Sequence, residues 1–126
     1  MSNSELPTMK GESMTVETSL DAQAIKCLFK GTADLRVGTT LQELLRDLHN
    51  KAMELGVKNV NVDFQNLEFM NSSCFKSFVT WLSDVQDLPS DRQYAIRFHS
   101  NPEFLWQRRS LHALRCFAAE LVTVDN

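Results

Sequence analysis

The chain has 126 residues, of which 43% are apolar and 23% are charged, and this length and composition are typical of one soluble globular domain. Its formal charge of −3 argues against a general nucleic-acid binder, because phosphate contacts need an excess of lysine and arginine. The basic cluster of Arg108, Arg109 and Arg115 is interpreted as a solvated helix face. No apolar run approaches the roughly 20 residues of a membrane-spanning helix, so we predict a cytoplasmic protein with no membrane span.

Residues 1 to 13 are polar and show no hydrophobic periodicity, which predicts a disordered leader before a folded domain over residues 14–126. The same segment lacks the apolar stretch of a secretory signal. The three cysteines, Cys27, Cys74 and Cys116, are odd in number and have no C-x-x-C spacing. This pattern favours reduced thiols, two of them in the core, over a disulfide framework or a zinc site.

Two strands joined by a tight turn are expected at the start of the domain. Residues 14–20 and 23–30 have the patterns of strands, and in the second of them apolar side chains alternate with lysines, as in a half-buried strand. The turn is predicted at Asp21 and Ala22.

The first helix is expected between Thr40 and Gly56. Thr40 and Glu43 have the spacing of a capping box, and glycine is common where a helix stops. One face of the helix is apolar, and it consists of Leu41, Leu44, Leu45, Leu48 and Ala52.

The middle of the chain predicts a strand that ends at Phe64, a short loop, and a helix over about 72–85. The apolar residues of this helix are expected to face inward: Phe75, Phe78, Val79 and Leu82.

Another strand is predicted over residues 94–98, and Asn101 followed by Pro102 is typical of a helix start. Residues 121–124 fit either a short last strand or a packing tail. This alternation predicts an α/β fold with a four- to five-stranded mixed sheet and helices mainly on one face.

Asn71 is placed to cap the helix that follows it, with Ser72 and Ser73 in its first turn. The first-turn N–H groups have no partners within the helix and the helix dipole is positive there, so added negative charge is tolerated. From the residues alone, consecutive serines at a helix start are most simply explained as caps.

Three motifs in order resemble the STAS domain of anti-sigma-factor antagonists. The family has a strand ending in Asp, a hydrophobic pair and Asp-Ser-Ser/Thr-Gly opening a helix, and this chain has Asp63, Phe69-Met70 and Asn71-Ser72-Ser73-Cys74 in register. Gly31-x-x-Asp34 matches a second motif, and the strand, proline turn and helix after residue 94 match the third. The resemblance covers residues 14 to 125.

This resemblance implies a non-enzymatic, phosphorylation-switched binding module without a cofactor. Its partner would be a serine kinase of the histidine-kinase-like ATPase type that is also an anti-sigma factor. That kinase would phosphorylate Ser72, with Ser73 as the alternative acceptor, and a PP2C-type phosphatase would reset the switch. The implied partner-binding residues are Asp34, Asn71, Ser72, Ser73, Cys74, Phe75 and Lys76.

The chain departs from the family pattern at three places. Asn71 replaces Asp, Cys74 replaces Gly, and Phe75-Lys76 replaces a small apolar pair. Cys74 would add a side chain where a partner might approach. An alternative function is therefore a STAS-like scaffold that is not phosphorylated, or an accessory subunit of another signalling or lipid-transport complex.

An enzyme would need a nucleophile with a base. Ser72 or Cys74 could pair with His49, His99 or His112, and a helix start would lower the pKa of Cys74. No histidine has a spacing that predicts contact, and no G-x-S-x-G elbow or phosphate loop occurs.

A metal pair of Asp34 and Asp63 is less well supported than a capped turn and a strand end. Neither a catalytic nor a metal site is therefore expected.

Overall fold

The computed structural model describes residues 6–125, and over this range six strands form one mixed sheet in the order β1-β2-β3-β4-β5-β6. The strands β1 to β3 are antiparallel, and β3 to β6 are parallel. The strands are β1 (Met9–Lys10), β2 (Met14–Asp21), β3 (Ala24–Ala33), β4 (Asn59–Met70), β5 (Ala95–His99) and β6 (Val122–Asp125).

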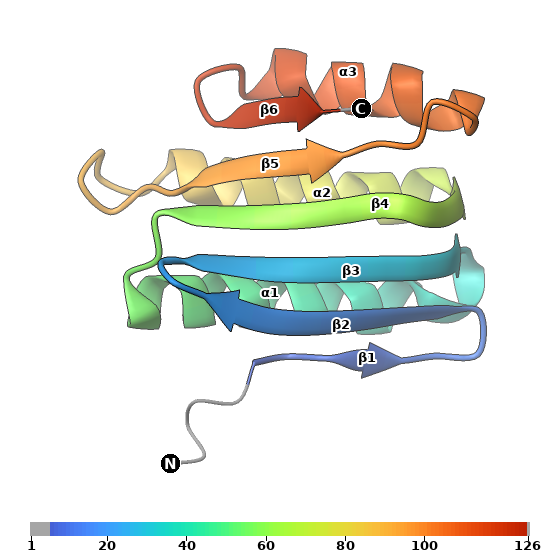
Figure 1. Ribbon diagram of the computed structural model, residues 1–126, viewed down its shortest axis with the longest axis horizontal. Coiled ribbons are helices and arrows are strands. Elements are labelled where there is room, and N and C mark those ends of the chain that lie inside the picture. Colours follow the sequence, from blue (N-terminus) through green and yellow to red (C-terminus); the bar gives the residue numbers. More distant parts are fainter. Residues whose placement is uncertain (1–5, 126) are drawn as a thin grey trace.

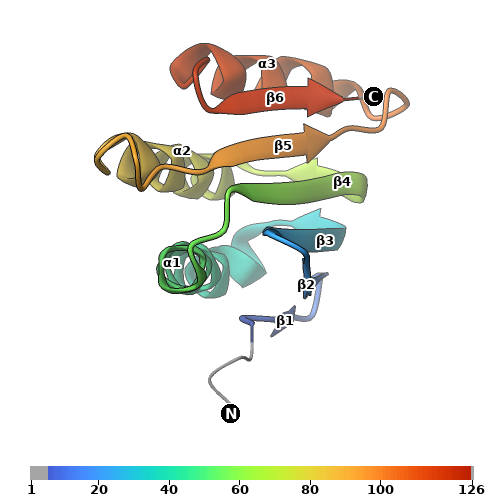
Figure 2. The same ribbon diagram turned by 60° about the vertical axis from the view of Figure 1, so that its left-hand side comes forward.

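Three α-helices connect the parallel strands and pack on one face of the sheet (Figure 1 and Figure 2). They are α1 (Gly38–Leu55), α2 (Ser72–Gln86) and α3 (Leu105–Phe117), and a short 3₁₀ helix, η2 (Leu35–Val37), leads into α1. The predicted α/β class and the placement of the helices are confirmed. The sheet has six strands rather than four or five, because residues 122–125 form a last strand, β6, and the unpredicted β1 adds a strand at the other edge.

The core lies between the helices and the sheet face that they cover. Alternate side chains of β3 and β4 are fully buried, and the others lie on the open face, so the period-2 pattern separates the two faces. At the centre Phe64 contacts Phe29 and Phe78 edge to face, with ring centroids 5.3 and 5.5 Å apart. Because these rings come from β3, β4 and α2, they join the layers.

The prediction of a disordered leader is wrong at Met9 and Lys10, which form β1 against β2. Met9 is only 6% exposed and belongs to the core, and a single apolar residue among polar neighbours gives no periodicity to detect. Residues 1–5 of the predicted leader lie outside the described range.

The hairpin turn between β2 and β3 lies at Ala22 and Gln23, one residue later than predicted, since Asp21 pairs with Ala24. Ala22 has a φ of +57°, a conformation that turn residues adopt more often than others. The two strands of the hairpin are confirmed, but β3 continues three residues beyond the predicted end, to Ala33.

Thr40 is not the cap of α1. Asp34 accepts a hydrogen bond from the backbone N–H of Arg36, and the chain therefore already turns helically at η2 and continues into Gly38. The helix end is confirmed, because Gly56 adopts the left-handed conformation that terminates α1.

β4 does not end at Phe64 but continues to Met70 through two irregularities in its pairing with β3. Likewise, α3 begins at Leu105, later than predicted. Asn101 accepts a hydrogen bond from the N–H of Glu103 and so caps the preceding turn. The residues predicted as a loop after Phe64 thus belong to β4, and the predicted helix cap at Asn101 belongs to a turn before α3.

A hydrogen-bonded group joins α1, α2 and Tyr94, the residue that precedes β5, at one end of the core. The indole N–H of Trp81 donates to the hydroxyl of Tyr94 at 2.8 Å. Tyr94 lies 2.7 Å from Nδ1 of His49, and burial lowers the pKa of this imidazole. The tyrosine hydroxyl therefore accepts from the tryptophan and shares a second hydrogen bond with the imidazole of His49.

Candidate functional site

The predicted cap of α2 is confirmed. The side chain of Asn71 accepts a hydrogen bond of 2.8 Å from the backbone N–H of Cys74, which satisfies one of the donors that every helix start leaves free. Ser72 and Ser73, the next two residues, are exposed. Both hydroxyl groups are therefore accessible to another protein at the positive end of the helix dipole.

Asp34 lies beside this helix start, although the two are 37 or more residues apart in sequence. The N–H of Asn71 donates to the carbonyl oxygen of Ala33 at 2.9 Å. The carbonyl oxygen of the next residue, Asp34, lies 3.8 Å from the thiol of Cys74. The parallel pairing of β3 with β4, which ends at Ala33 and Met70, causes this meeting.

The carboxylate of Asp34 is held by three neighbours. Arg36 binds it through Nη2 at 2.8 Å and Nε at 3.3 Å, and the hydroxyl groups of Ser13 and Thr32 donate at 3.0 and 3.3 Å. The hydrogen bond from Arg36 is the main reason that the pKa of Asp34 lies well below its usual range. Asp34 thus presents a negative charge at any physiological pH.

Cys74 does not obstruct the surface, contrary to what its replacement of glycine suggested. Its side chain has no exposed area and packs in the core. The expectation of a lowered pKa is also wrong, because burial and then the charge of Asp34 raise the pKa of this thiol. A thiol with a raised pKa is a poorer nucleophile at neutral pH.

Two large apolar side chains are exposed at the same end of the sheet. Leu35 is 84% exposed just after Asp34, and Phe69 is 47% exposed at the end of β4, where it pairs with Thr32. We call Asp34, Leu35, Phe69, Ser72 and Ser73 the serine surface. Exposed apolar and charged groups together are typical of a protein-binding surface.

Phe75 and Lys76 take different positions on α2. Phe75 is partly buried and packs against the core, while Lys76 is exposed. Of this pair, only Lys76 offers a fully accessible side chain to a partner.

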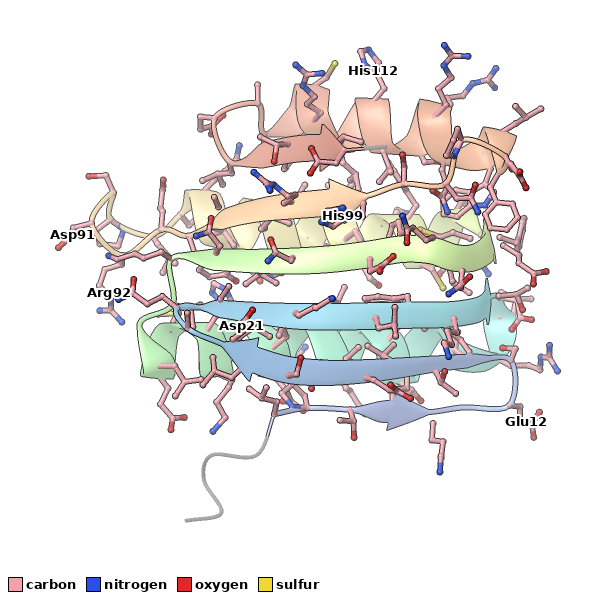
Figure 3. All side chains as sticks on the ribbon, viewed as in Figure 1. Glu12, Asp21, Asp91, Arg92, His99 and His112 are labelled. Carbon is pink, nitrogen blue, oxygen red and sulfur yellow. The ribbon has the colours of Figure 1, made fainter. Side chains whose placement is uncertain are left out.

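Ser13 and Arg36 were missed from the sequence. Ser13 comes from the assumed leader and reaches Asp34 across 21 positions, so no local pattern could reveal it. Arg36 stands two residues after Asp34, a spacing at which an arginine can fold back on a turn carboxylate, so the local sequence does carry a signal for this contact. Glu12, labelled in Figure 3, lies 4.0 Å from Arg36.

The structure does not bring the other candidate groups together. Asp63 accepts from the N–H of Gln65 on β4, and seven residues of strand, about 20 Å, separate it from the Asp34 end of the sheet. Within residues 6–125 no cluster of three or more acidic, histidine or cysteine side chains could hold a metal ion.

Each histidine has a neighbour other than the serines or Cys74. His49 contacts Tyr94, His99 lies 3.9 Å from Asp125, and His112 lies 3.4 Å from the thiol of Cys116. None of the helices described in residues 6–125 has both the length and the hydropathy that a bilayer crossing needs.

Comparison with known structures identifies the fold. The chain is similar to the crystal structure of an anti-sigma factor antagonist from Mycobacterium paratuberculosis, with a TM-score of 0.63 over 90% of this chain and 86% of that chain. The two sequences are 12% identical, so the likeness concerns the fold. The predicted STAS-like fold is thereby confirmed. No family model and no curated protein matches the sequence.

Proposed function

We propose that this protein is a phosphorylation-switched binding module of the anti-sigma-factor-antagonist type. In its unphosphorylated form it binds a serine kinase of the histidine-kinase-like ATPase type that also serves as an anti-sigma factor. Phosphorylation at Ser72 releases that partner. The observation that carries the proposal is the exposed pair Ser72 and Ser73 on a capped helix start, beside a permanently charged Asp34.

A phosphoryl group on Ser72 would add a charge of about −1.5 to −2 at neutral pH. The free N–H groups and the dipole of the helix start compensate this charge within the folded protein, by roughly 0.3–1 kcal/mol for an exposed site. A partner that packs against Leu35 and Phe69 would have to take this phosphate out of water, which is costly unless the partner supplies a group that pairs with it. The modification therefore disfavours the complex more than it disfavours the fold.

The first test is phosphorylation in vitro. The purified protein is incubated with ATP and each serine kinase of this type encoded in the same genome, and the modified residue is found by mass spectrometry. We expect one phosphate, on Ser72, and no modification of the Ser72→Ala variant by the same kinase. Transfer to Ser73 in the natural sequence would support the alternative acceptor. Absence of phosphate on both serines with every kinase would refute the switch.

The second test is partner binding, measured by calorimetry with the kinase identified in the first test. Ser72→Asp should weaken binding at least tenfold, whereas Ser72→Ala should retain it. Ser90→Asp, in an exposed loop between α2 and β5, is the control for an added charge elsewhere. Equal affinities of Ser72→Asp and Ser72→Ala would contradict a charge-based release.

The alternative is a scaffold that binds its partner without phosphorylation, for example an accessory subunit of another signalling or lipid-transport complex. Asn71 favours this alternative, because it caps α2 without the carboxylate that precedes the acceptor serine in the family pattern. If the protein forms a stable complex in cells while both serines stay unmodified, the scaffold function is supported.

If the switch operates, a PP2C-type phosphatase would restore the binding form. Incubation of the phosphorylated protein with such a phosphatase and Mn²⁺ should remove the phosphate and restore the affinity for the kinase.

A further inference from the structure

A cavity of about 520 Å³ lies between α3 and the end of β6, apart from the residues of the serine surface. It is formed by the β5–α3 loop, one side of α3 and the last strand. Its lining residues are Ser100, Asn101, Pro102, Phe104, Leu105, Gln107, Arg108, Leu111, His112, Arg115 and Val124.

The charged and titratable groups of this lining all carry or can acquire positive charge. Among the described residues that line the cavity they are Arg108, His112 and Arg115, and no carboxylate is present. Their spacing of four and then three residues places them in one stripe along α3. Figure 3 shows His112 projecting from α3 on the side away from β5. In a chain with a net charge of −3, this local charge selects an anionic occupant.

The cavity also reaches the free edge of the sheet. Over residues 6–125, β6 pairs with β5 and with no other strand. Leu121 accepts a hydrogen bond from the N–H of Ile96 in β5, and Asp125 accepts one from the N–H of Ser100, which directly follows β5, each at 2.8 Å. Because alternate residues of a parallel strand bond to the same neighbour, the N–H and C=O of Val124 face the open side, and Val124 lines the cavity.

The groove offers apolar contacts as well. Leu105 is 79% exposed at the start of α3, and Val124 also lines the groove. From Leu105 to Arg115 the helix is about 15 Å long. This length corresponds to four or five residues of an extended strand.

From these features we propose that the groove between α3 and β6 binds an extended acidic segment of a partner protein, which adds to the sheet as a strand beside β6. Backbone hydrogen bonds to Val124 would fix the segment, as in other cases of strand addition to a free sheet edge. Its acidic side chains on the helix side would pair with Arg108 and Arg115, while apolar side chains contact Leu105. This binding is independent of phosphorylation at Ser72.

The test begins with a display library of random octapeptides, selected in parallel on the natural protein and on the double variant Arg108→Glu, Arg115→Glu. We expect peptides with acidic residues at alternate positions to be enriched on the natural protein alone. The absence of any such enrichment, or equal enrichment on both proteins, would overturn the proposal.

The best peptide is then synthesised with a fluorescein label, and its affinity is measured by fluorescence anisotropy. The double variant should bind at least tenfold more weakly. Arg109→Glu is the matched control, because Arg109 is exposed on the same helix but does not line the cavity, and its effect should be less than about threefold. Circular dichroism confirms that each variant is folded, and a variant that fails this check is replaced by Arg108→Gln, Arg115→Gln.

Two further measurements distinguish strand addition from simple charge attraction. Two peptides are made, one N-methylated at the odd positions and one at the even positions, and only the peptide whose methyl groups replace the N–H groups that face β6 should lose binding. The unmethylated peptide should also shift the amide NMR signal of Val124. If both N-methylated peptides bind as well as the parent, the segment does not pair with β6. If free glutarate at millimolar concentration displaces the peptide completely, the cavity takes a small organic anion instead.

Discussion

The backbone N–H of Asn71 donates a hydrogen bond to the carbonyl oxygen of Ala33, with an N–O distance of 2.9 Å. This bond extends the pairing of β3 with β4 by one step beyond Met70. It sets the position of the α2 start relative to Asp34, and hence the geometry of the serine surface. The first two predictions concern the residues that maintain this arrangement.

Replacement of Asn71 by alanine should destabilise the protein. The variant leaves the backbone N–H of Cys74 without its 2.8 Å partner, and loss of such a cap costs about 1 kcal/mol. The free energy of unfolding is measured by urea denaturation. Asn71→Asp is the control, since aspartate is an equally good cap, and its stability should remain close to that of the natural protein. Equal losses in both variants would show that the cap does not contribute.

Replacement of Gly31 by alanine should destabilise the protein by about 2 kcal/mol or more, because strained backbone and overlap both oppose it. Gly31 has a φ of +105°, and a Cβ atom there would overlap the carbonyl oxygen of Ser13. Gly38→Ala is the matched control. Gly38 starts α1 with open space around it, so alanine should be neutral or stabilising by up to about 1 kcal/mol. Similar effects of the two substitutions would refute the role of close packing at Gly31.

The three thiols should differ in reactivity. Cys116 is exposed, whereas Cys27 and Cys74 are buried and burial raises the pKa of each, to about 12 for Cys27. Since the thiolate is the reactive form, Ellman's reagent at pH 8 should label one thiol rapidly and the others only in denaturant. Cys116→Ser should show no rapid labelling. Fast reaction of Cys74 in that variant would indicate that the α2 start opens readily.

Stability should fall as the pH decreases below about 6.5, the ordinary pKa of histidine. Burial lowers the pKa of His49 in the folded state, and the charge of Asp84 offsets this effect only in part. In this range the unfolded chain binds the proton more readily than the folded protein does, so protonation favours unfolding. Well above pH 6.5, His49 is neutral in both the folded and the unfolded protein, so it does not contribute to the pH dependence of stability there.

The measurement is the urea midpoint between pH 5 and 8 for the natural protein and for His49→Gln. Glutamine can still form a hydrogen bond with Tyr94 but does not titrate, so its profile should be flatter. A profile as steep as that of the natural protein would assign the pH dependence to other groups.

Much of the fold could be predicted from local patterns. The alternation in β3, the apolar face of α1 and the cap at Asn71 each depend on residues within a few positions of one another. The errors arose where two local signals compete. Thr40 has the spacing of a cap, but Asp34 begins the helical turn earlier. Asn101 has the form of a helix cap, but its side chain closes a turn before α3.

The sequence by itself determined the α/β alternation, the cap of α2 and the candidate serines, because periodicity and capping are properties of neighbouring residues. Only the tertiary structure decided which distant groups meet. It placed Ser13 beside Asp34, turned Cys74 into the core and brought the cations of α3 beside the free edge of β6. These contacts follow from strand register and from the packing of helices on the sheet, which no local pattern encodes.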